Sequence, residues 1–304
     1  MNYKKIIKNQ KTRFSILKAL SWVPDSVMLS VQYRIKMNRG CNLKNPQRWT
    51  EKLQVYKMYY RNPVLGRCVD KYEVRSYVEE KGLSDILNKL YGVYGDVSEI
   101  SFDDLPDSFV LKTTDGGGGL NVILVRDKSV INKQEILGSL EGWMSRFKPG
   151  RTPSGREWAY SLIKSSRIIA EELLVNKDNP EAGVEDFKIL CFHGEPKYVI
   201  VDKDRYIDHK RNFYTTEWER VDVTTDHEQF ETLYPKPKNF ERMLDIARKL
   251  SEDFPFVRVD LYNIDGKIYF GELTFYPWTG YVQFTPDKFD YTLGKLMDCS
   301  SFMK

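Results

Sequence analysis

The spacing of apolar residues predicts mainly helices in the first hundred residues of the chain. Residues 1–60 carry few strand signals and favour helical structure. Asp70 is a suitable N-cap for a helix that ends at Gly82, and Ser84 is placed to cap a further helix that runs to Gly95. The chain is therefore predicted to begin with a mainly helical region.

The pattern changes after residue 100, where short runs of β-branched and apolar residues are separated by turn signals. Strands are predicted at 109–111, 121–125 and 167–174, on both sides of a turn at 193–196 and on both sides of a turn at 263–266, with helices at 133–147 and 239–254. Strands joined by short turns pair antiparallel. The sequence therefore predicts an α+β fold with antiparallel sheets rather than alternating parallel units.

Composition narrows the class of protein. A chain of 304 residues, 41% of them hydrophobic, is long enough to bury a large core in one composite domain or in two to three smaller ones. The four cysteines are far apart and form no CxxC pair, and the three histidines are scattered, which argues against a zinc site or a disulfide scaffold. The sequence contains neither an apolar run of about 18 residues nor a signal peptide, so we expect a cytoplasmic protein.

Positive charge is concentrated near the N-terminus. Residues 1–40 carry nine Lys or Arg and one acid, Asp25, whereas the rest of the chain has slightly more acids than bases. Because the body is not basic, we expect no nucleic-acid partner. Basic and apolar side chains are interleaved in residues 4–20. This pattern fits a helix that associates weakly with the inner face of an anionic membrane, or a helix that packs on the body, and we favour the packed helix.

Four consecutive glycines, Gly116, Gly117, Gly118 and Gly119, lie between two predicted strands, and Lys112 precedes them. Such a run suits a backbone that approaches a phosphate chain closely, or else a flexible hairpin tip, and the lysine favours phosphate. The residues that follow favour a strand, whereas Walker A and Rossmann loops both lead into a helix. The remaining type is a glycine hairpin that closes over the phosphates of a nucleotide.

A phosphate site also needs a cation, and magnesium prefers hard oxygen ligands such as carboxylates. Asp260 and Glu272 interrupt the apolar runs of the last predicted hairpin. A two-residue turn at 265–266 would place Asp260 opposite Gly271, whereas a three-residue loop, or a bulge with the same effect, would place it opposite Glu272. We predict the register that pairs the two acids. Asp115 either ties the glycine turn through an Asx hydrogen bond or helps to hold the metal.

These features together resemble the ATP-grasp fold, and more closely the TupA-like ATP-grasp family, named for teichuronopeptide biosynthesis. The resemblance runs from about residue 42 to residue 280 and rests on the segments "NPVLGRCVDKYEVRSYV", "AEELL", "EDFKILCFHGEPKYV", "VRVDLY" and "FGELTF". It implies two α+β subdomains whose antiparallel sheets clasp a nucleotide. The implied division is a helical region at 1–100 with the first nucleotide lysine, a small subdomain at 101–166 with the glycine hairpin, and a large subdomain at 167–304 with the hinge strand and the metal hairpin.

The resemblance also implies ATP and Mg²⁺ as cofactors and a role for each site residue. Lys71 and Lys112 would meet the phosphates from opposite sides, and Arg258 would face the reacting phosphoryl group. These three are the expected catalytic residues. The expected nucleotide contacts are Lys71, Lys112, Gly116, Gly117, Gly118, Gly119, Glu171, Glu172, Leu173, Leu174, Asp186 and Lys188, with 171–174 as the adenine hinge and Asp186 near the ribose. The expected metal ligands are Asp260, Glu272 and Thr274, where many ATP-grasp enzymes have Asn in place of Thr274.

Enzymes of this type activate a carboxylate as an acyl phosphate and pass it to an amine. The resemblance therefore implies an ATP-dependent carboxylate–amine ligase of polysaccharide or capsule biosynthesis. It suggests a uronic acid and an amino acid or amine as partners, at least one of them linked to a sugar. Two rival functions remain: a glycosyltransferase, for which Asp202 and Asp204 supply a D-x-D motif, and a kinase of the same fold that phosphorylates a sugar-like acceptor.

The acceptor is expected near residues 204–218. Arg205, Lys210, Arg211 and Trp218 in this segment could hold an anionic, sugar-bearing partner. A solvated loop explains the same segment equally well.

Overall fold

The computed structural model describes residues 9, 17, 19–117, 121–153, 155–176, 179–181 and 183–303. Most of the basic N-terminal segment lies outside these residues, and so do Gly118 and Gly119. The predicted arrangement of that segment, as a packed or a membrane-associated helix, and half of the predicted glycine loop therefore lie outside the described part of the chain.

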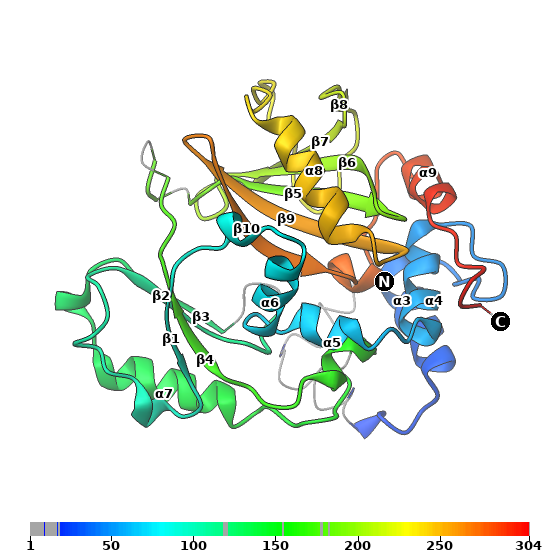
Figure 1. The fold of residues 1–304 in the computed structure, drawn as a ribbon. Helices are drawn as coiled ribbons and strands as arrows, with labels where there is room; N and C mark the ends of the chain where they lie inside the picture. The colour runs from blue at the N-terminus through cyan, green and yellow to red at the C-terminus, as the bar shows by residue number, and fades with distance from the viewer. Residues whose placement is uncertain are drawn as a thin grey trace.

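Two antiparallel sheets form the centre of the molecule (Figure 1). The smaller sheet has the strand order β1-β4-β2-β3, and its strands are β1 (Leu90–Tyr94), β2 (Phe109–Thr113), β3 (Val122–Val125) and β4 (Ile168–Glu171). The larger sheet has the order β10-β9-β5-β6-β7-β8, and its strands are β5 (Asp186–Phe192), β6 (Glu195–Lys203), β7 (Lys210–Thr215), β8 (Arg220–Val221), β9 (Phe256–Ile264) and β10 (Lys267–Thr274). Each of the three ranges implied by the resemblance contributes at least one strand to the smaller sheet.

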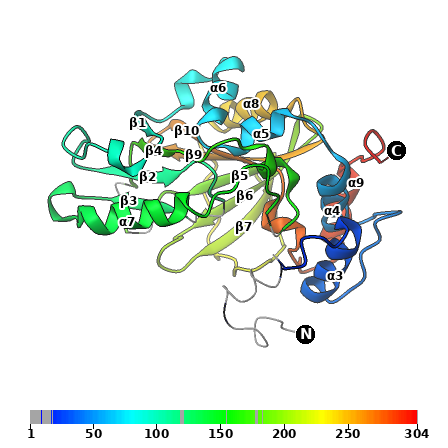
Figure 2. The same ribbon diagram turned by 90° about the horizontal axis from the view of Figure 1, so that it is seen from below.

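Helices cover the sheets and build two separate apolar cores (Figures 1 and 2). The α-helices are α3 (Asp25–Met37), α4 (Trp49–Tyr59), α5 (Val64–Val69), α6 (Glu73–Glu80), α7 (Lys133–Met144), α8 (Phe240–Ser251) and α9 (Lys288–Leu296), and the 3₁₀ turns are η1 (Ser84–Ile86), η2 (Val97–Glu99), η3 (Lys128–Val130), η4 (Trp158–Leu162) and η5 (Pro277–Gly280). α7 packs on the smaller sheet to make one core. α8 packs on β5, β6 and β9, and α4, α5, α6 and α9 complete the larger core.

Most of the predicted elements are confirmed, including the antiparallel α+β class. The helix predicted from Ser84 to Gly95 is wrong. The chain makes one 3₁₀ turn at 84–86, and residues 90–94 then form β1, which pairs with β4. The physical reason is tertiary. Pairing with β4 and packing on the core of the smaller sheet stabilise residues 90–94 more than the weak amphipathic helix that their spacing allows.

The hairpin of β9 and β10 combines a tight turn with a bulge. Ile264 pairs with Lys267, so Asp265 and Gly266 form a two-residue turn, and both have positive φ, as that turn requires. The register then shifts by one residue at Gly271, which brings Glu272 opposite Asp260. The predicted pairing of the two acids is therefore confirmed, and a bulge rather than a longer loop produces it.

Gly271 is needed because the bulge brings two backbones together. A Cβ atom at this position would lie 2.9 Å from the backbone oxygen of Asp260, closer than carbon and oxygen pack. Any side chain here would therefore displace the strand that carries Asp260.

Lys57 ties α4 to a strained turn beyond β10. The residue is 1% exposed, and its Nζ donates hydrogen bonds to Thr279 O at 2.7 Å and Gln54 Oε1 at 3.2 Å. Trp278, Thr279 and Gly280 have three successive positive φ values, a conformation that is costly for a β-branched residue. Burial lowers the pKa of Lys57 to about 7.

We predict that Gly271→Ala destabilises the protein by about 1–3 kcal/mol, because the added methyl group must push β9 and β10 apart. Urea unfolding of the purified variant measures this change. Gly138→Ala is the matched control: no atom lies within 4 Å of its added methyl group, so we expect unchanged or slightly higher stability. Equal stabilities of the two variants would contradict the role assigned to the bulge.

We predict that Lys57 makes the free energy of unfolding rise between about pH 7 and about pH 9, because the unfolded chain holds a proton that the folded chain lacks. Lys57→Met removes this contribution. The free energy of unfolding of the variant minus that of the wild type should therefore be greatest near pH 7. This difference should fall by about 2 kcal/mol between pH 7 and pH 9. Urea unfolding at the two pH values tests this, and a difference that does not change with pH would show that Lys57 is charged when buried.

Candidate functional site

A cavity of about 80 Å³ lies between the two sheets, where the junction of α5 and α6 meets β2, β4, β9 and β10. The chemically active residues that line it are Lys71, Arg75, Lys112, Glu171 and Glu272. Ligand pockets usually measure about 300–1,000 Å³, so this cavity is smaller than a nucleotide requires.

Lys71 and Lys112 are brought together by the backbone between them. Asp70 Oδ1 accepts hydrogen bonds from the amides of Tyr72 and Glu73 at 2.9 Å, in the turn that leads into α6. The N-cap of α6 is Tyr72 rather than the predicted Asp70. The amide of Lys71 donates to Thr114 O at 3.0 Å, which docks the end of β2 on this helix start. Both lysines therefore line the same cavity from different elements.

Lys112 lies in an ion pair with the hinge strand. Its ammonium is 2.5 Å from Glu171 Oε2, and Arg75 Nη1 is 3.4 Å from the other oxygen of the same carboxylate. Glu171 is buried at the end of β4, so the two cations balance a charge that would be costly alone. Glu171 thus contacts a lysine and an arginine, although the sequence suggested a place beside adenine.

The described part of the glycine loop lies against the same cavity. Gly116 lines it, and a Cβ atom on Gly117 would lie 3.6 Å from the hydroxyl of Tyr160. Asp115 accepts a hydrogen bond of 2.5 Å from Ser166 Oγ, which ties the entry of the loop to the segment before β4. The bond occupies one of the two carboxylate oxygens, so the metal contact considered for Asp115 stays a prediction.

The connection after β4 supplies a backbone edge to the cavity. The amide of Glu172 donates to Lys89 O at 2.9 Å, and its carboxylate accepts from the amide of Lys89 at 3.3 Å. Leu173 is half-buried, and Leu174 lines the cavity. Glu172 therefore anchors the connection to the segment before β1 and leaves Leu174 facing the cavity.

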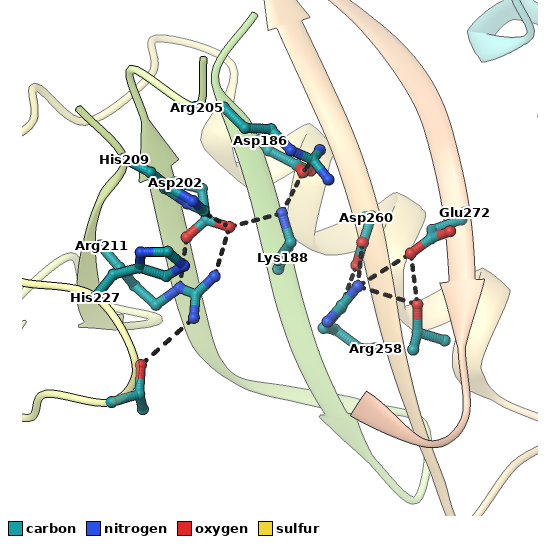
Figure 3. Close-up of polar contacts among 12 residues, drawn as sticks. Asp186, Lys188, Asp202, Arg205, His209, Arg211, His227, Arg258, Asp260 and Glu272 are labelled. Carbon is teal, nitrogen blue, oxygen red and sulfur yellow. Dashed lines mark hydrogen bonds and ion pairs between the residues drawn. The ribbon is translucent and has the colours of Figure 1, made fainter. Parts of the chain in front are cut away.

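The predicted metal ligands surround one guanidinium group (Figure 3). Arg258 donates two hydrogen bonds of 2.6 Å to Asp260, and its Nη2 also lies 3.1 Å from Glu272 Oε1 and 3.1 Å from Thr274 Oγ1. Thr274 donates to Glu272 Oε1 at 2.9 Å. The structure therefore brings the oxygens of Asp260, Glu272 and Thr274 together on one face of the larger sheet.

Burial and neighbouring charges set the electrostatics of this face. Burial raises the pKa of Asp260, and the Arg258 guanidinium opposes that effect through its two short bonds. Burial also acts to raise the pKa of Glu272, but the charges of Arg258 and Lys71 outweigh it and leave this pKa below its ordinary value. The side chain of Glu272 is 43% exposed and opens towards the cavity. Burial lowers the pKa of Lys71 to about 8, against the pull of Glu272.

A second group of buried charges continues across the same sheet face (Figure 3). Lys188, opposite Asp260 in the sheet, forms ion pairs with Asp186 and with Asp202, the latter at 3.0 Å. Asp202 in turn accepts two hydrogen bonds from Arg211, at 2.5 and 2.9 Å. Arg205 lies 3.2 Å from Asp186. Negative and positive groups therefore alternate from β10 to β7.

Two residues suggested for an acceptor lie away from this face. Trp218 stacks on Tyr214 and packs against Phe240 of α8, on the opposite side of the larger sheet. Lys210 is bound to Asp208 at the surface, 3.1 Å away. Their residue types alone suggested a site. The register of β7 turns Lys210 away from the face that carries Arg211, and Trp218, which follows β7, packs against Tyr214 and Phe240.

Two tyrosines at the cavity were not predicted as site residues. Tyr160 and Tyr262 both line it, and Tyr262 follows Asp260 by two positions on β9. Because side chains alternate along a strand, Asp260 and Tyr262 lie on the same face of β9. This spacing is the signal that would have identified Tyr262. Tyr160 lies on a 3₁₀ turn far along the chain and gives no such signal.

The donor set suits a hard divalent cation. Two carboxylates and a hydroxyl converge within one hydrogen-bonded group, and Mg²⁺ is usually held by one or two carboxylates together with phosphate and water. Each carboxylate has about four lone-pair sites, so Asp260 can keep Arg258 and still accept a cation. Over the described residues, no group of three or more His, Cys, Asp or Glu is arranged as a metal site of protein ligands alone.

The chain is similar to several solved ligase structures. D-alanine–D-alanine ligase from Bacillus anthracis is 18% identical, with 69% of this chain and 57% of that chain covered and a TM-score of 0.42. The D-alanine–D-alanine ligase from Helicobacter pylori is 13% identical, with 76% and 60% covered and a TM-score of 0.42. N5-carboxyaminoimidazole synthetase from Staphylococcus aureus, complexed with ADP, is 12% identical, with 68% and 44% covered and a TM-score of 0.37. The chain therefore spans about half the length of these structures.

No curated protein matches the sequence significantly. A family model matches residues 51–298, which includes every site residue discussed above and both sheets. The chain belongs to the TupA-like ATPgrasp family.

Proposed function

We propose that this protein is an ATP-dependent ligase that joins a carboxylate to an amine through an acyl phosphate. The observation that carries the proposal is the meeting of Lys71, Lys112 and Glu272 at one cavity between two sheets, with the Arg258–Asp260 pair beside it. Cations on one side and carboxylates on the other suit a polyphosphate bound together with a divalent cation. Membership of the ATPgrasp family supports ATP as the nucleotide.

The two lysines are proposed to hold the phosphates. An ammonium group has three donors, so Lys112 can keep Glu171 and still bind a phosphate oxygen. Lys71 approaches from the start of α6, and phosphate charge would favour its protonated form despite burial. Gly116 lines the same cavity as Lys112, and Gly116 and Gly117 would supply backbone amides to the same phosphates.

The nucleoside is proposed to lie along the connection after β4. Leu173 and Leu174 would offer backbone groups and apolar contacts to adenine, while Glu172 fixes the connection against Lys89. Asp186 would accept from the ribose hydroxyls, since its Oδ1 atom is buried without a hydrogen-bond partner and Lys188 and Arg205 bind its other oxygen.

Asp260, Glu272 and Thr274 are proposed to hold Mg²⁺. When bound, the ion would neutralise phosphate charge and orient the phosphoryl group that is transferred. The threonine hydroxyl is a hard oxygen donor, as is the amide oxygen of the asparagine common at this position.

In the proposed reaction a carboxylate oxygen of the substrate bonds to the terminal phosphorus of ATP, and the bond from that phosphorus to ADP breaks. An amine then bonds to the acyl carbon, phosphate leaves, and the nitrogen loses a proton. Arg258 would stabilise the charge on the transferred group, and Lys71 and Lys112 would hold the nucleotide in place. Positioning and charge balance supply the catalysis, so no nucleophilic side chain is needed.

We further propose that one substrate is linked to a sugar of a cell-surface polysaccharide, as a uronic acid or its amine partner. The proposal rests on the family, while Arg205 supplies a half-exposed cation at the rim of the charged face. The family favours the ligase over the rival glycosyltransferase. Asp202, the first acid of the D-x-D motif, binds Arg211 and Lys188.

The test is an assay of ADP release over a panel of uronic acids and amines, with mass analysis of the product. The proposal predicts ADP and phosphate in equal amounts, and a product that has lost one water relative to its two substrates. A product that retains the phosphoryl group would identify a kinase. Consumption of a nucleotide sugar in the absence of ATP would identify a glycosyltransferase.

We predict that Lys71→Ala and Lys112→Ala each weaken ATP binding about 10- to 100-fold, because each removes a charge-assisted bond to phosphate. The measurement is the shift in melting temperature on addition of ATP and Mg²⁺. Lys249→Ala, at an exposed position on α8, is the matched control and should behave like the wild type. Wild-type ATP affinity in both site variants would refute the phosphate assignment.

We predict that Glu272→Gln retains most of the affinity for nucleotide and loses turnover at least 100-fold. The amide fills the same space but lacks the negative charge that balances Mg²⁺. Isothermal titration with ADP and the ADP-release assay measure the two quantities. Glu241→Gln, on the exposed side of α8, controls for the loss of one carboxylate. Turnover that is equal in both variants would exclude Glu272 from the reaction.

A further inference from the structure

The outer face of α3 carries a stripe of exposed apolar side chains. Val27, Val31 and Ile35 are 50%, 47% and 44% exposed, and their spacing of four residues places them in line along the helix. The opposite face buries Met28, Leu29 and Tyr33 in the body. α3 is thus fully packed on one side and still apolar on the other, which an ordinary surface helix is not.

The stripe continues into an open groove beside it. Leu43, Met58, Tyr59 and Met303 line the groove together with Val27 and Val31, and its polar lining residues are Ser26, Ser30 and Lys44. Trp22, just before the helix, is 80% exposed. These residues form one apolar surface, the α3 face, at the end of the molecule opposite α7 (Figures 1 and 2).

The charges around the α3 face are positive. Residues 1–40 contain nine Lys or Arg and one acid, and that acid, Asp25, is bound to Arg156 at 2.7 Å. Arg34 is exposed on the helix itself, within the stripe. Six of the nine basic residues lie outside the described part of the chain. Among the described residues, Arg34 in the stripe and Lys44 in the groove supply positive charge at the apolar surface, and Arg39 is bound to Asp287.

We propose that the α3 face docks the protein on an anionic lipid bilayer. Apolar side chains would enter the boundary between headgroups and acyl chains, with Trp22 at the depth that tryptophan prefers, and the basic residues would bind lipid phosphates. A second copy of the chain fits this surface poorly, because a two-fold contact would bring the exposed Arg34 of both copies onto the same apolar face. Docking is peripheral, since none of the described helices is long and apolar enough to cross a membrane.

The docked orientation leaves the candidate site accessible. The cavity is lined by residues of α5, β2, β4, β9 and β10, and none of the residues of the α3 face lines it. Membrane binding and nucleotide binding can therefore be measured independently, and the docking proposal does not rest on the proposed reaction.

The test is sedimentation of the full chain with vesicles. The probes are vesicles of phosphatidylglycerol and phosphatidylcholine in equal parts, and vesicles of phosphatidylcholine alone. We expect binding to the anionic vesicles, release from them at high salt, and at least tenfold weaker binding to the neutral vesicles. Absence of binding to anionic vesicles at low salt would overturn the proposal.

A matched pair of double variants tests the face itself. Val31→Asp/Ile35→Asp should reduce binding to anionic vesicles at least tenfold. The control is Val130→Asp/Leu233→Asp, which adds the same two charges at apolar positions outside the α3 face; these two residues are 79% and 69% exposed. Apart from the effect of the changed net charge, the control should bind anionic vesicles as the wild type does. Melting curves confirm that both variants fold. Bilayer docking would be contradicted if both double variants lost vesicle binding equally. It would also be contradicted if the wild type formed a dimer in sedimentation equilibrium and only the α3 variant disrupted that dimer.

Discussion

The buried ion pair between Arg258 and Asp260 is the interaction around which the site is arranged. Both side chains lie within the larger sheet, where an unpaired charge of either sign would be strongly unfavourable. Two bonds of 2.6 Å satisfy the pair, and Arg258 Nη2 then reaches Glu272 and Thr274 on the next strand. Removal of one partner would leave the other buried without compensation, so the pair imposes the arrangement of its neighbours.

The backbone supplies the second constraint, because the tight turn of the β9–β10 hairpin alone would put Asp260 opposite Gly271. The bulge at Gly271 adds one residue and brings Glu272 into the position opposite Asp260. Beyond β10 the chain enters the turn with three positive φ values, which Lys57 and Gln54 hold through backbone oxygens. Buried side chains of α4 thus stabilise the strained backbone that follows β10.

Much of this arrangement could be predicted from sequence, and the ATP-grasp fold was among those predictions. The alternation of Arg258 and Asp260 and the glycines after Lys112 are local signals, and they indicated the correct strands. The strand at 90–94 was missed because its partner, β4, lies some 75 residues further on and no local signal reports it. The ion pair between Lys112 and Glu171 was missed for the same reason, since it joins two strands whose adjacency only the folded sheet reveals.

The family and the geometry of the site together support a nucleotide bound between the sheets with its cation at β9 and β10. The most direct measurement is anomalous scattering from crystals grown with ADP and Mn²⁺ in place of Mg²⁺. The account predicts a manganese peak among the oxygens of Asp260, Glu272 and the phosphates, with adenine along residues 172–174. A peak elsewhere, or ADP bound outside the cavity between the two sheets, would contradict it.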